Sequence, residues 1–179
     1  MTTDALVRFL VEHAPRWVAA QREAFQPTSD PISPEDREIL RHYFGHAVLQ
    51  ASRLTWVDEI PNPDFYVALE RAGQPRSLDF GLMTGITFVD TIVVSHSQYE
   101  GPATWRPLLF HELVHVVQYR ILGLERFVGE YIEGWARNGF FYEKIPLERM
   151  AYELQGRFDL AAGRFSAEAE VVRALEQVV

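Results

Sequence analysis

The chain has 179 residues, no cysteine and a formal charge of −8, because 25 Asp and Glu residues outnumber 17 Lys and Arg residues. A single domain of this length can bury a stable core without disulfides, and without thiolates any zinc must take His and carboxylate ligands. The acidic balance argues against nucleic acid as a partner, since a nucleic-acid surface needs clustered basic residues.

The N-terminal segment predicts a protein that is neither exported by a signal peptide nor inserted into a membrane. Met1–Leu10 lacks a basic stretch followed by a long apolar one, and no apolar run in the chain approaches transmembrane length. We therefore expect a cytoplasmic protein without a membrane or nucleic-acid partner, folded as one domain over residues 1–179.

The first 50 residues are predicted to be mainly helical. Residues 4–25 repeat apolar groups at helical intervals, and a proline-rich loop follows them. Ser33 is a suitable N-cap for a second helix over residues 34–50. This helix carries His42 and His46 four residues apart, but no carboxylate motif accompanies them, so we interpret both as ordinary core or surface histidines.

Residues 51–102 are predicted to form a small antiparallel sheet. Residues 53–60 alternate and are rich in β-formers, and 65–69 indicate a short strand or turn. Residues 81–94 indicate one or two strands, with a turn or bulge at Asp90 and Thr91. The segment from Ala72 to Ser77 is predicted to be a loop.

The chemistry of the chain is concentrated in the sequence His111-Glu112-Leu-Val-His115. Residues four apart on a helix share one face, so both imidazoles can reach one metal ion, while Glu112 lies beside a water on that ion. The flanking residues are apolar nearly all round, which is typical of a buried helix, and Gly123 is its natural C-cap. Unpaired polar groups are costly in such a helix, which favours a metal site over a core helix with hydrogen-bonded polar residues.

The last third of the chain is predicted to be helical again. Helices are expected over residues 124–137, from Pro146 to Phe158, and from an N-cap at Ser166 to Val178. The fold class is therefore α+β: a mainly helical domain with a small sheet before the motif helix.

A catalytic zinc usually takes three protein ligands, so one more is needed. The metzincin pattern is excluded because Gln118 and Ile121 stand where its Gly and third His would be. A downstream carboxylate remains, as in gluzincins. The candidate acids are Glu125, Glu130, Glu133, Glu143, Glu148 and Glu153. Glu130 and Glu133 have a spacing like that of thermolysin-type enzymes, but the companion Asn-Glu-x-x-Ser-Asp pattern is missing.

The segment Ile-Pro-Leu-Glu148-Arg-Met-Ala-Tyr152 resembles the E-x-x-A-D segment of several small gluzincin-like families. Together with the motif helix it makes residues 104–157 similar to compact bacterial zinc-peptidase domains, including the domain known as the extracellular contractile injection system core. The resemblance implies a zincin-like fold, zinc held by His111, His115 and Glu148, and Glu112 as general base. Tyr152 departs from the pattern, since it replaces an Asp that orients a ligating His.

The expected function is zinc-dependent hydrolysis of a peptide bond in a peptide or protein substrate, with an extended substrate added to an edge strand at 84–89 or 91–95. Four residues are candidates by type to stabilise the oxyanion: Tyr131, Tyr142, Tyr152 and His96. Two alternatives are a zinc-binding scaffold or regulatory module with little turnover, and a metal-free helical interaction domain. The sequence does not indicate an oligomeric state.

Overall fold

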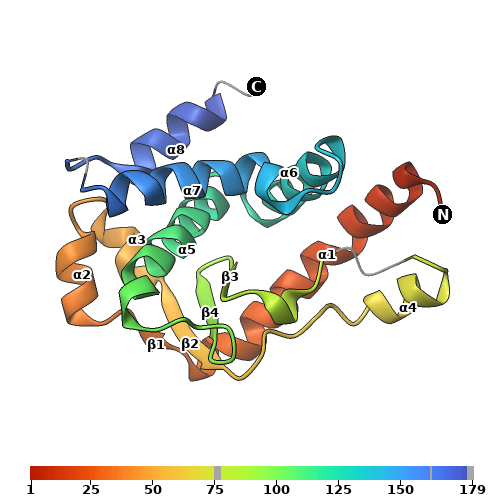
Figure 1. The fold of residues 1–179 in the computed structure, drawn as a ribbon, viewed down its shortest axis with the longest axis horizontal. Helices are drawn as coiled ribbons and strands as arrows, with labels where there is room; N and C mark the ends of the chain where they lie inside the picture. The colour runs from red at the N-terminus through yellow and green to blue at the C-terminus, as the bar shows by residue number, and fades with distance from the viewer. Residues whose placement is uncertain (75–77, 162, 177–179) are drawn as a thin grey trace.

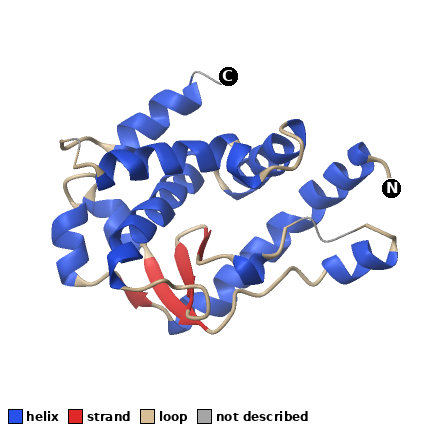
Figure 2. Ribbon diagram, in the orientation of Figure 1, coloured by secondary structure: helices blue, strands red, loops and turns tan. Residues whose placement is uncertain are grey.

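The computed structural model describes residues 1–74, 78–161 and 163–176, and it has the predicted α+β, mainly helical fold (Figures 1 and 2). The helices are α1 (Thr3–Phe25), α2 (Pro34–Leu40), α3 (His46–Ala51), α4 (Tyr66–Arg71), α5 (Pro102–Leu122), α6 (Leu124–Arg137), α7 (Pro146–Asp159) and α8 (Ala167–Glu176). Short 3₁₀ turns are η1 (Gln26–Thr28), η2 (Phe80–Leu82) and η3 (Tyr142–Lys144), and the strands are β1 (Asp30–Pro31), β2 (Arg53–Val57), β3 (Gly85–Phe88) and β4 (Thr91–Ser95).

The sheet is mixed, with the order β1-β2-β4-β3, so the prediction of an antiparallel sheet was wrong. β3 and β4 form the antiparallel hairpin, turning at Val89 and Asp90, whereas β2 pairs with β4 in parallel. Alternating apolar residues specify the faces of a strand but not the direction of its partner. Here the chain passes through α4, η2 and β3 between β2 and β4, and this crossover makes the two strands parallel.

The sheet separates two hydrophobic clusters, and α5 lies on one face of it while α1 lies on the other (Figure 1). Successive side chains of a strand point to opposite faces. Accordingly Ile92 and Val94 belong to the α5 cluster, and Val93 and Phe88 to the α1 cluster. α7 and α8 pack on the side of α5 away from the sheet, and α6 packs on α1. The motif helix α5 therefore lies at the centre of the packed elements, with residues 109–119 buried.

Local sequence signals fix both ends of α5. Pro102 occupies its first turn after Gly101, and Gly123 ends it with a φ of 76°. That left-handed conformation suits glycine, which has no Cβ to clash. Ser33 caps α2 as predicted, accepting a hydrogen bond of 3.1 Å from the Asp36 amide. Ser166 caps α8 similarly, through the Ala169 amide, while the predicted end of this helix near Val178 lies outside the described residues.

Two element predictions were wrong. The helix expected over residues 34–50 is split into α2 and α3 by a turn at 41–45, where the Gly45 amide donates to Glu168 of α8 at 2.8 Å. Residues 66–69 belong to α4, with Phe65 in the turn before it, whereas a short strand or turn was expected over residues 65–69. α2 has seven residues and α3 and α4 have six each, and helices this short are not stable from local propensity alone. In the described part of the chain, no helix is both long and apolar enough to cross a membrane.

Candidate metal centre

α5 presents two histidines of the motif together on one buried face. His111 and His115 are each only 5% exposed, and their Nε2 atoms are 3.0 Å apart. The four-residue spacing places the rings one helical turn apart, as the sequence predicts. Two imidazoles held with these nitrogens facing each other define a point at which a third partner can bind both.

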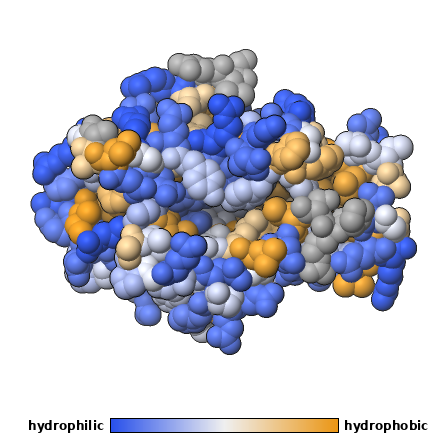
Figure 3. All heavy atoms as spheres, in the orientation of Figure 1, coloured by the Kyte–Doolittle hydropathy of each residue, from blue (hydrophilic) through white to orange (hydrophobic). Residues whose placement is uncertain are grey.

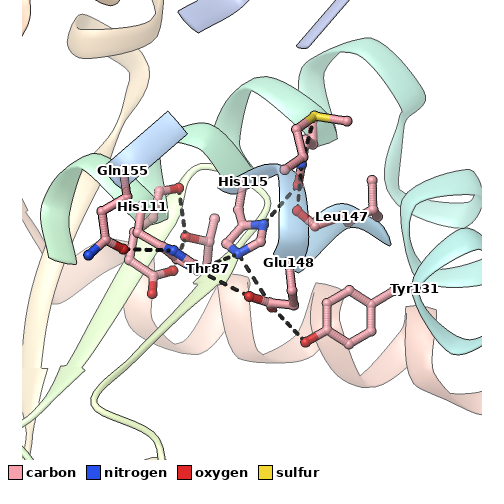
Figure 4. A network of polar contacts seen from close by, with 10 residues as sticks. Thr87, His111, His115, Tyr131, Leu147, Glu148 and Gln155 are labelled. Atoms are coloured by element: carbon pink, nitrogen blue, oxygen red, sulfur yellow. Dashed lines mark hydrogen bonds and ion pairs between the residues drawn. The ribbon is translucent and has the colours of Figure 1, made fainter. Parts of the chain in front are cut away.

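α7 supplies that third partner through Glu148, which is 3% exposed and lies in the first turn of the helix. One carboxylate oxygen, Oε2, lies 3.1 Å from His111 Nε2, and the other, Oε1, lies 3.4 Å from His115 Nε2 (Figure 4). The ligand atoms of the three residues lie within 4.8 Å of one another, and this buried group could hold a metal ion.

The competing acids are not brought into this cluster. Glu133 has a side chain that is 54% exposed and pairs with Arg137 on the outer face of α6. Glu130 pairs with Arg126 and Arg137 on the same helix. The remaining candidates are exposed: Glu125, Glu143 and Glu153. Among the described acidic residues, Glu148 alone joins His111 and His115 in a group that could hold a metal.

Two glutamines orient the imidazoles. His115 Nδ1 lies 2.8 Å from Gln118 Oε1. His111 Nδ1 lies 3.2 Å from Gln155 Oε1 (Figure 4). The Gln118 amide is fixed in this sense because its Nε2 donates to the Leu147 carbonyl at 3.0 Å. An amide oxygen only accepts hydrogen bonds, so each Nδ1 carries the hydrogen and each neutral ring turns an unprotonated Nε2 toward Glu148.

The cluster therefore collects hydrogen-bond acceptors that have no donor between them. Two Nε2 lone pairs and a carboxylate meet in a buried space, where an uncompensated arrangement of this kind is costly. A cation at the centre removes the conflict, and either a proton or a metal ion can fill this role. The donor set of two imidazoles and one carboxylate is one that zinc accepts in proteins.

The pKa values of His115 and Glu148 also indicate that the cluster binds a cation. Burial lowers the pKa of His115, but the charge of Glu148 and hydrogen bonds to Glu148 and Gln118 outweigh it and raise the pKa to about 9. Burial raises the pKa of Glu148, yet the two histidines outweigh it and hold this pKa well below its usual range. Without a metal, the cluster thus retains a proton on a histidine and a charge on the carboxylate.

Glu112 lies beside the cluster and is not one of its three converging groups. Its side chain is 3% exposed, and the Thr87 hydroxyl of β3 lies 2.7 Å from Oε2 and 3.1 Å from the Glu112 backbone carbonyl. On the same strand, a Cβ at Gly85 would stand 2.7 Å from Oε1, so glycine leaves the room for this carboxylate. Burial is the largest influence on Glu112 and raises its pKa. A raised pKa favours proton exchange nearer neutrality.

The four candidates for stabilising the oxyanion have different surroundings in the structure. Tyr131 of α6 donates its hydroxyl to Glu148 Oε1 at 2.7 Å, so it positions the carboxylate. Tyr142 lines the cleft beside Glu148, and burial, followed by the charge of Glu148, raises its pKa well above 10. The Tyr152 ring packs against the ring of His111 at a tilt of 56°, with 4.5 Å between the ring centroids. His96 is stacked on Trp56, at 4.9 Å, and is not part of the cluster.

The cluster opens into a cleft of about 850 Å³, measured to include the solvent at its mouth. Glu112, His115 and Glu148 form its polar end, and every residue of β3 lines it. β3 is the last strand of the sheet in the described part of the chain, so of the two strands considered from sequence it is the edge strand, and β4 is internal. The space-filling view shows hydrophobic atoms around a hollow between the α6–α7 layer and the region of η2 and β3 (Figure 3).

Sequence reasoning missed the residues that orient the site. Gln118 is an isolated amide on an apolar helix, three residues after His115, and Gln155 lies seven residues after Glu148 on the same face of α7. Helical spacing therefore could have indicated both. Thr87 and Gly85 alternate on one face of β3, but their approach to Glu112 depends on how α5 packs on the sheet, which the sequence does not indicate.

Comparison of the chain with models of protein families, with curated proteins and with solved structures finds no significant match in any of the three. The likeness of residues 104–157 to gluzincin-like domains therefore stays a prediction. What the centre does has to be inferred from its own residues.

Proposed function

We propose that this protein is a zinc-dependent peptidase, with the metal held by His111, His115 and Glu148 and with Glu112 as general base. The proposal is carried by one observation: three buried acceptor groups converge at the end of an open cleft. The buried carboxylate of Glu112 lies next to them and is not one of the three. A purely structural zinc site closes its coordination and has no use for a base at its side.

Zinc is the metal that this donor set favours. The chain has no Cys, and two imidazoles with one carboxylate leave a position open in a tetrahedral centre, as in catalytic zinc sites. Zinc bound there would supply an acidified water and polarise a carbonyl group. The distances among the three ligand residues, 3.0 to 3.4 Å, are those of groups that face a common centre.

The protein's own residues provide the proton transfers. Glu112 accepts a proton from the attacking water as the hydroxyl adds to the carbonyl carbon, and it returns that proton to the amine nitrogen as the C–N bond breaks. Thr87 holds Oε2 of Glu112, which leaves Oε1 for this exchange. Two phenols line the cleft beside Glu148, those of Tyr131 and Tyr142, and they are the candidates to donate to the oxyanion.

The position of β3 at the edge of the sheet suits an extended peptide. Adding a substrate as a further strand satisfies backbone N–H and C=O groups on both sides, and it is a common mode of peptide recognition. The β3 residues line the cleft and lie directly beside Glu112, so a peptide on this edge would pass over the polar end of the cleft. The substrate class that follows is a peptide or an unfolded protein segment.

The test combines metal analysis with one isosteric change. Purified protein is loaded with zinc and assayed on fluorescently labelled denatured casein, alongside Glu112→Gln and the surface control Glu153→Gln on α7. We expect one bound zinc per chain in all three proteins. Activity should fall about 10²- to 10⁴-fold in Glu112→Gln, the usual contribution of a general base, and stay unchanged in the control.

The same experiment separates the alternatives. Zinc bound without turnover in the wild type would favour the scaffold or regulatory module. Absence of zinc binding would reject the metal centre altogether and leave the metal-free interaction domain. Full activity in Glu112→Gln would contradict the role of this residue.

A further inference from the structure

The cleft extends well beyond the metal centre, and its far part has a distinct chemical character. Beyond Glu112, His115 and Glu148, its walls come from α1, the segment before α4, η2, β3 and α6. The α1 wall is formed by Leu10, Ala14, Trp17 and Val18, which belong to the first 25 residues of the chain. These side chains have no part in the chemistry proposed above, so they call for a separate explanation.

The walls are mainly apolar and include many aromatic rings, several of which pack against one another. Trp17 of α1 contacts Phe80 at 5.0 Å and Phe88 at 5.3 Å between ring centroids. Across the cleft, Phe127 of α6 stacks on Tyr119 at 3.6 Å. Rings packed in this way keep their orientation, so the cavity exists before a ligand enters it.

We propose that this cleft is the specificity pocket of the peptidase, and that it selects peptides with a large apolar side chain, aromatic above all, on a residue flanking the scissile bond. This inference rests on the proposed function. An aromatic side chain in the cleft meets ring edges and faces that are already arranged for such contacts. The backbone of the same segment can pair with β3, because the strand lines the cleft with all of its residues.

The charge distribution points to the same substrate class. Among the described residues that line the cleft, none is Lys or Arg, and the only carboxylates are Glu112 and Glu148 at the metal end. A charged substrate side chain would therefore enter the apolar part without a partner, and burying an unpaired charge is strongly unfavourable. Short apolar side chains would fit but leave much of the wall without contact.

The experiment uses terminally blocked, internally quenched peptides of Gly and Ala with one central residue X, where X is Phe, Leu, Ala, Asp or Lys. Mass spectrometry locates the cleaved bond. With the zinc-loaded wild type we expect kcat/KM for X = Phe to exceed that for X = Ala by about 10- to 100-fold, as the burial of a large apolar side chain implies. Cleavage should occur next to X, and Asp and Lys should be the poorest.

A pair of substitutions on α1 tests whether this cleft is responsible. Ala14→Phe places a ring inside the cleft, whereas Ala20→Phe adds the same ring on the exposed side of the helix. The first should remove the preference for X = Phe without lowering bound zinc, and the second should change neither. Thermal unfolding shows whether Ala14→Phe is folded; if it is not, the peptide series on the wild type still decides the inference.

Binding to zinc-loaded Glu112→Gln, measured by calorimetry, distinguishes failure of this inference from failure of the proposed function. Cleavage with no preference among the five peptides would overturn the specificity pocket and leave the peptidase intact. If no peptide is cleaved but X = Phe binds at least tenfold tighter than X = Ala, the apolar pocket stands and the peptidase falls. Neither cleavage nor selective binding would reject both.

Discussion

The two amides that hold the imidazoles give the centre an unusual charge balance. Metal-ligating histidines usually donate their second N–H to a carboxylate, a backbone carbonyl or water. Gln118 and Gln155 fix the tautomers of His115 and His111 without adding negative charge. A zinc ion there would be neutralised only by Glu148 among its ligands, so more of its positive charge would remain to act on a water or a carbonyl.

Gln118 is the better test of this arrangement, because it is fully buried and links His115 to the Leu147 carbonyl beside Glu148. Gln118→Met keeps the volume but leaves His115 Nδ1 without an acceptor. We expect zinc affinity to fall about 10- to 100-fold, as for other partners of ligating histidines, measured by competition with a chromophoric chelator. Gln50→Met, at an exposed site on α3, is the control. An unchanged affinity would mean that Gln118 does not orient the ring.

Thr87 controls the proton affinity of Glu112. Burial raises the pKa of Glu112, and the hydrogen bond from Thr87 opposes this by stabilising the charged carboxylate. Thr87→Val removes the donor, so the pKa of Glu112 should rise further. A general base acts when deprotonated, and the acid limb of the kcat/KM profile should therefore move to higher pH, with kcat reduced about tenfold. Thr55→Val, on β2, serves as the control, since β2 contributes nothing to the cleft among the described residues. An acid limb that stays in place would contradict the coupling.

The position of Glu148 depends on how closely α7 approaches α6. A Cβ at Gly134 of α6 would stand 2.7 Å from Cδ of Pro146, the first residue of α7. Glu148 lies two residues further along, and Tyr131 of α6 donates to it, so the two helices together place the carboxylate. The proline ring is rigid, and an added methyl group must displace the first turn of α7.

Gly134→Ala should therefore weaken zinc binding and destabilise the protein by about 1–3 kcal/mol, the usual cost of overpacking. Gly129→Ala is a matched control on the same helix, because its added Cβ would meet nothing within 4 Å. There, replacing a helical glycine should be neutral or slightly stabilising. Zinc titration and urea unfolding of both variants provide the measurements. Equal behaviour of the two would show that α7 tolerates the displacement.

Elements defined by local signals could be predicted from the sequence, and those defined by distant contacts could not. Pro102 and Gly123 bound α5, and Ser33 and Ser166 cap α2 and α8, since each signal acts within a few residues. The parallel pairing of β2 with β4 and the interruption between α2 and α3 arise from segments far apart in the chain. Glu148 was inferred from a sequence resemblance, whereas its contacts with Tyr131 and the histidines required the packing of three helices.

In the whole molecule, a buried polar cluster lies within otherwise apolar surroundings. The hydrophobic clusters on the two sides of the sheet supply the burial free energy, while His111, His115 and Glu148 are desolvated and depend on a cation among them. Stability is thus linked to whichever cation is present, a proton or a metal. The pH dependence of unfolding should differ in sign between the metal-free and the zinc-bound protein.

For the metal-free protein, the pKa of His115 rises from 6.5 to about 9 on folding. Its contribution to stability is fully present below pH 6.5 and is lost as pH rises through about 9. The pKa of Glu148 falls from 4.5 on folding, so its contribution is present above pH 4.5 and lost as pH falls toward the folded pKa. Chelator-treated protein should therefore be less stable at pH 9 than at pH 6.

Zinc should reverse this trend, because it competes with the proton that His115 holds. The stabilisation by zinc, taken as the difference in melting temperature with and without the metal, should grow between pH 6 and pH 9. At free zinc about 100 times its Kd it should reach about 5–10 °C for a chain of this size. Calorimetry of the wild type and of His115→Gln, which lacks the titrating ring, measures both effects. The metal-free melting temperature could instead rise from pH 6 to 9 by the same amount in the two proteins. That result would mean that His115 does not carry the proton and that another group compensates the buried acceptors.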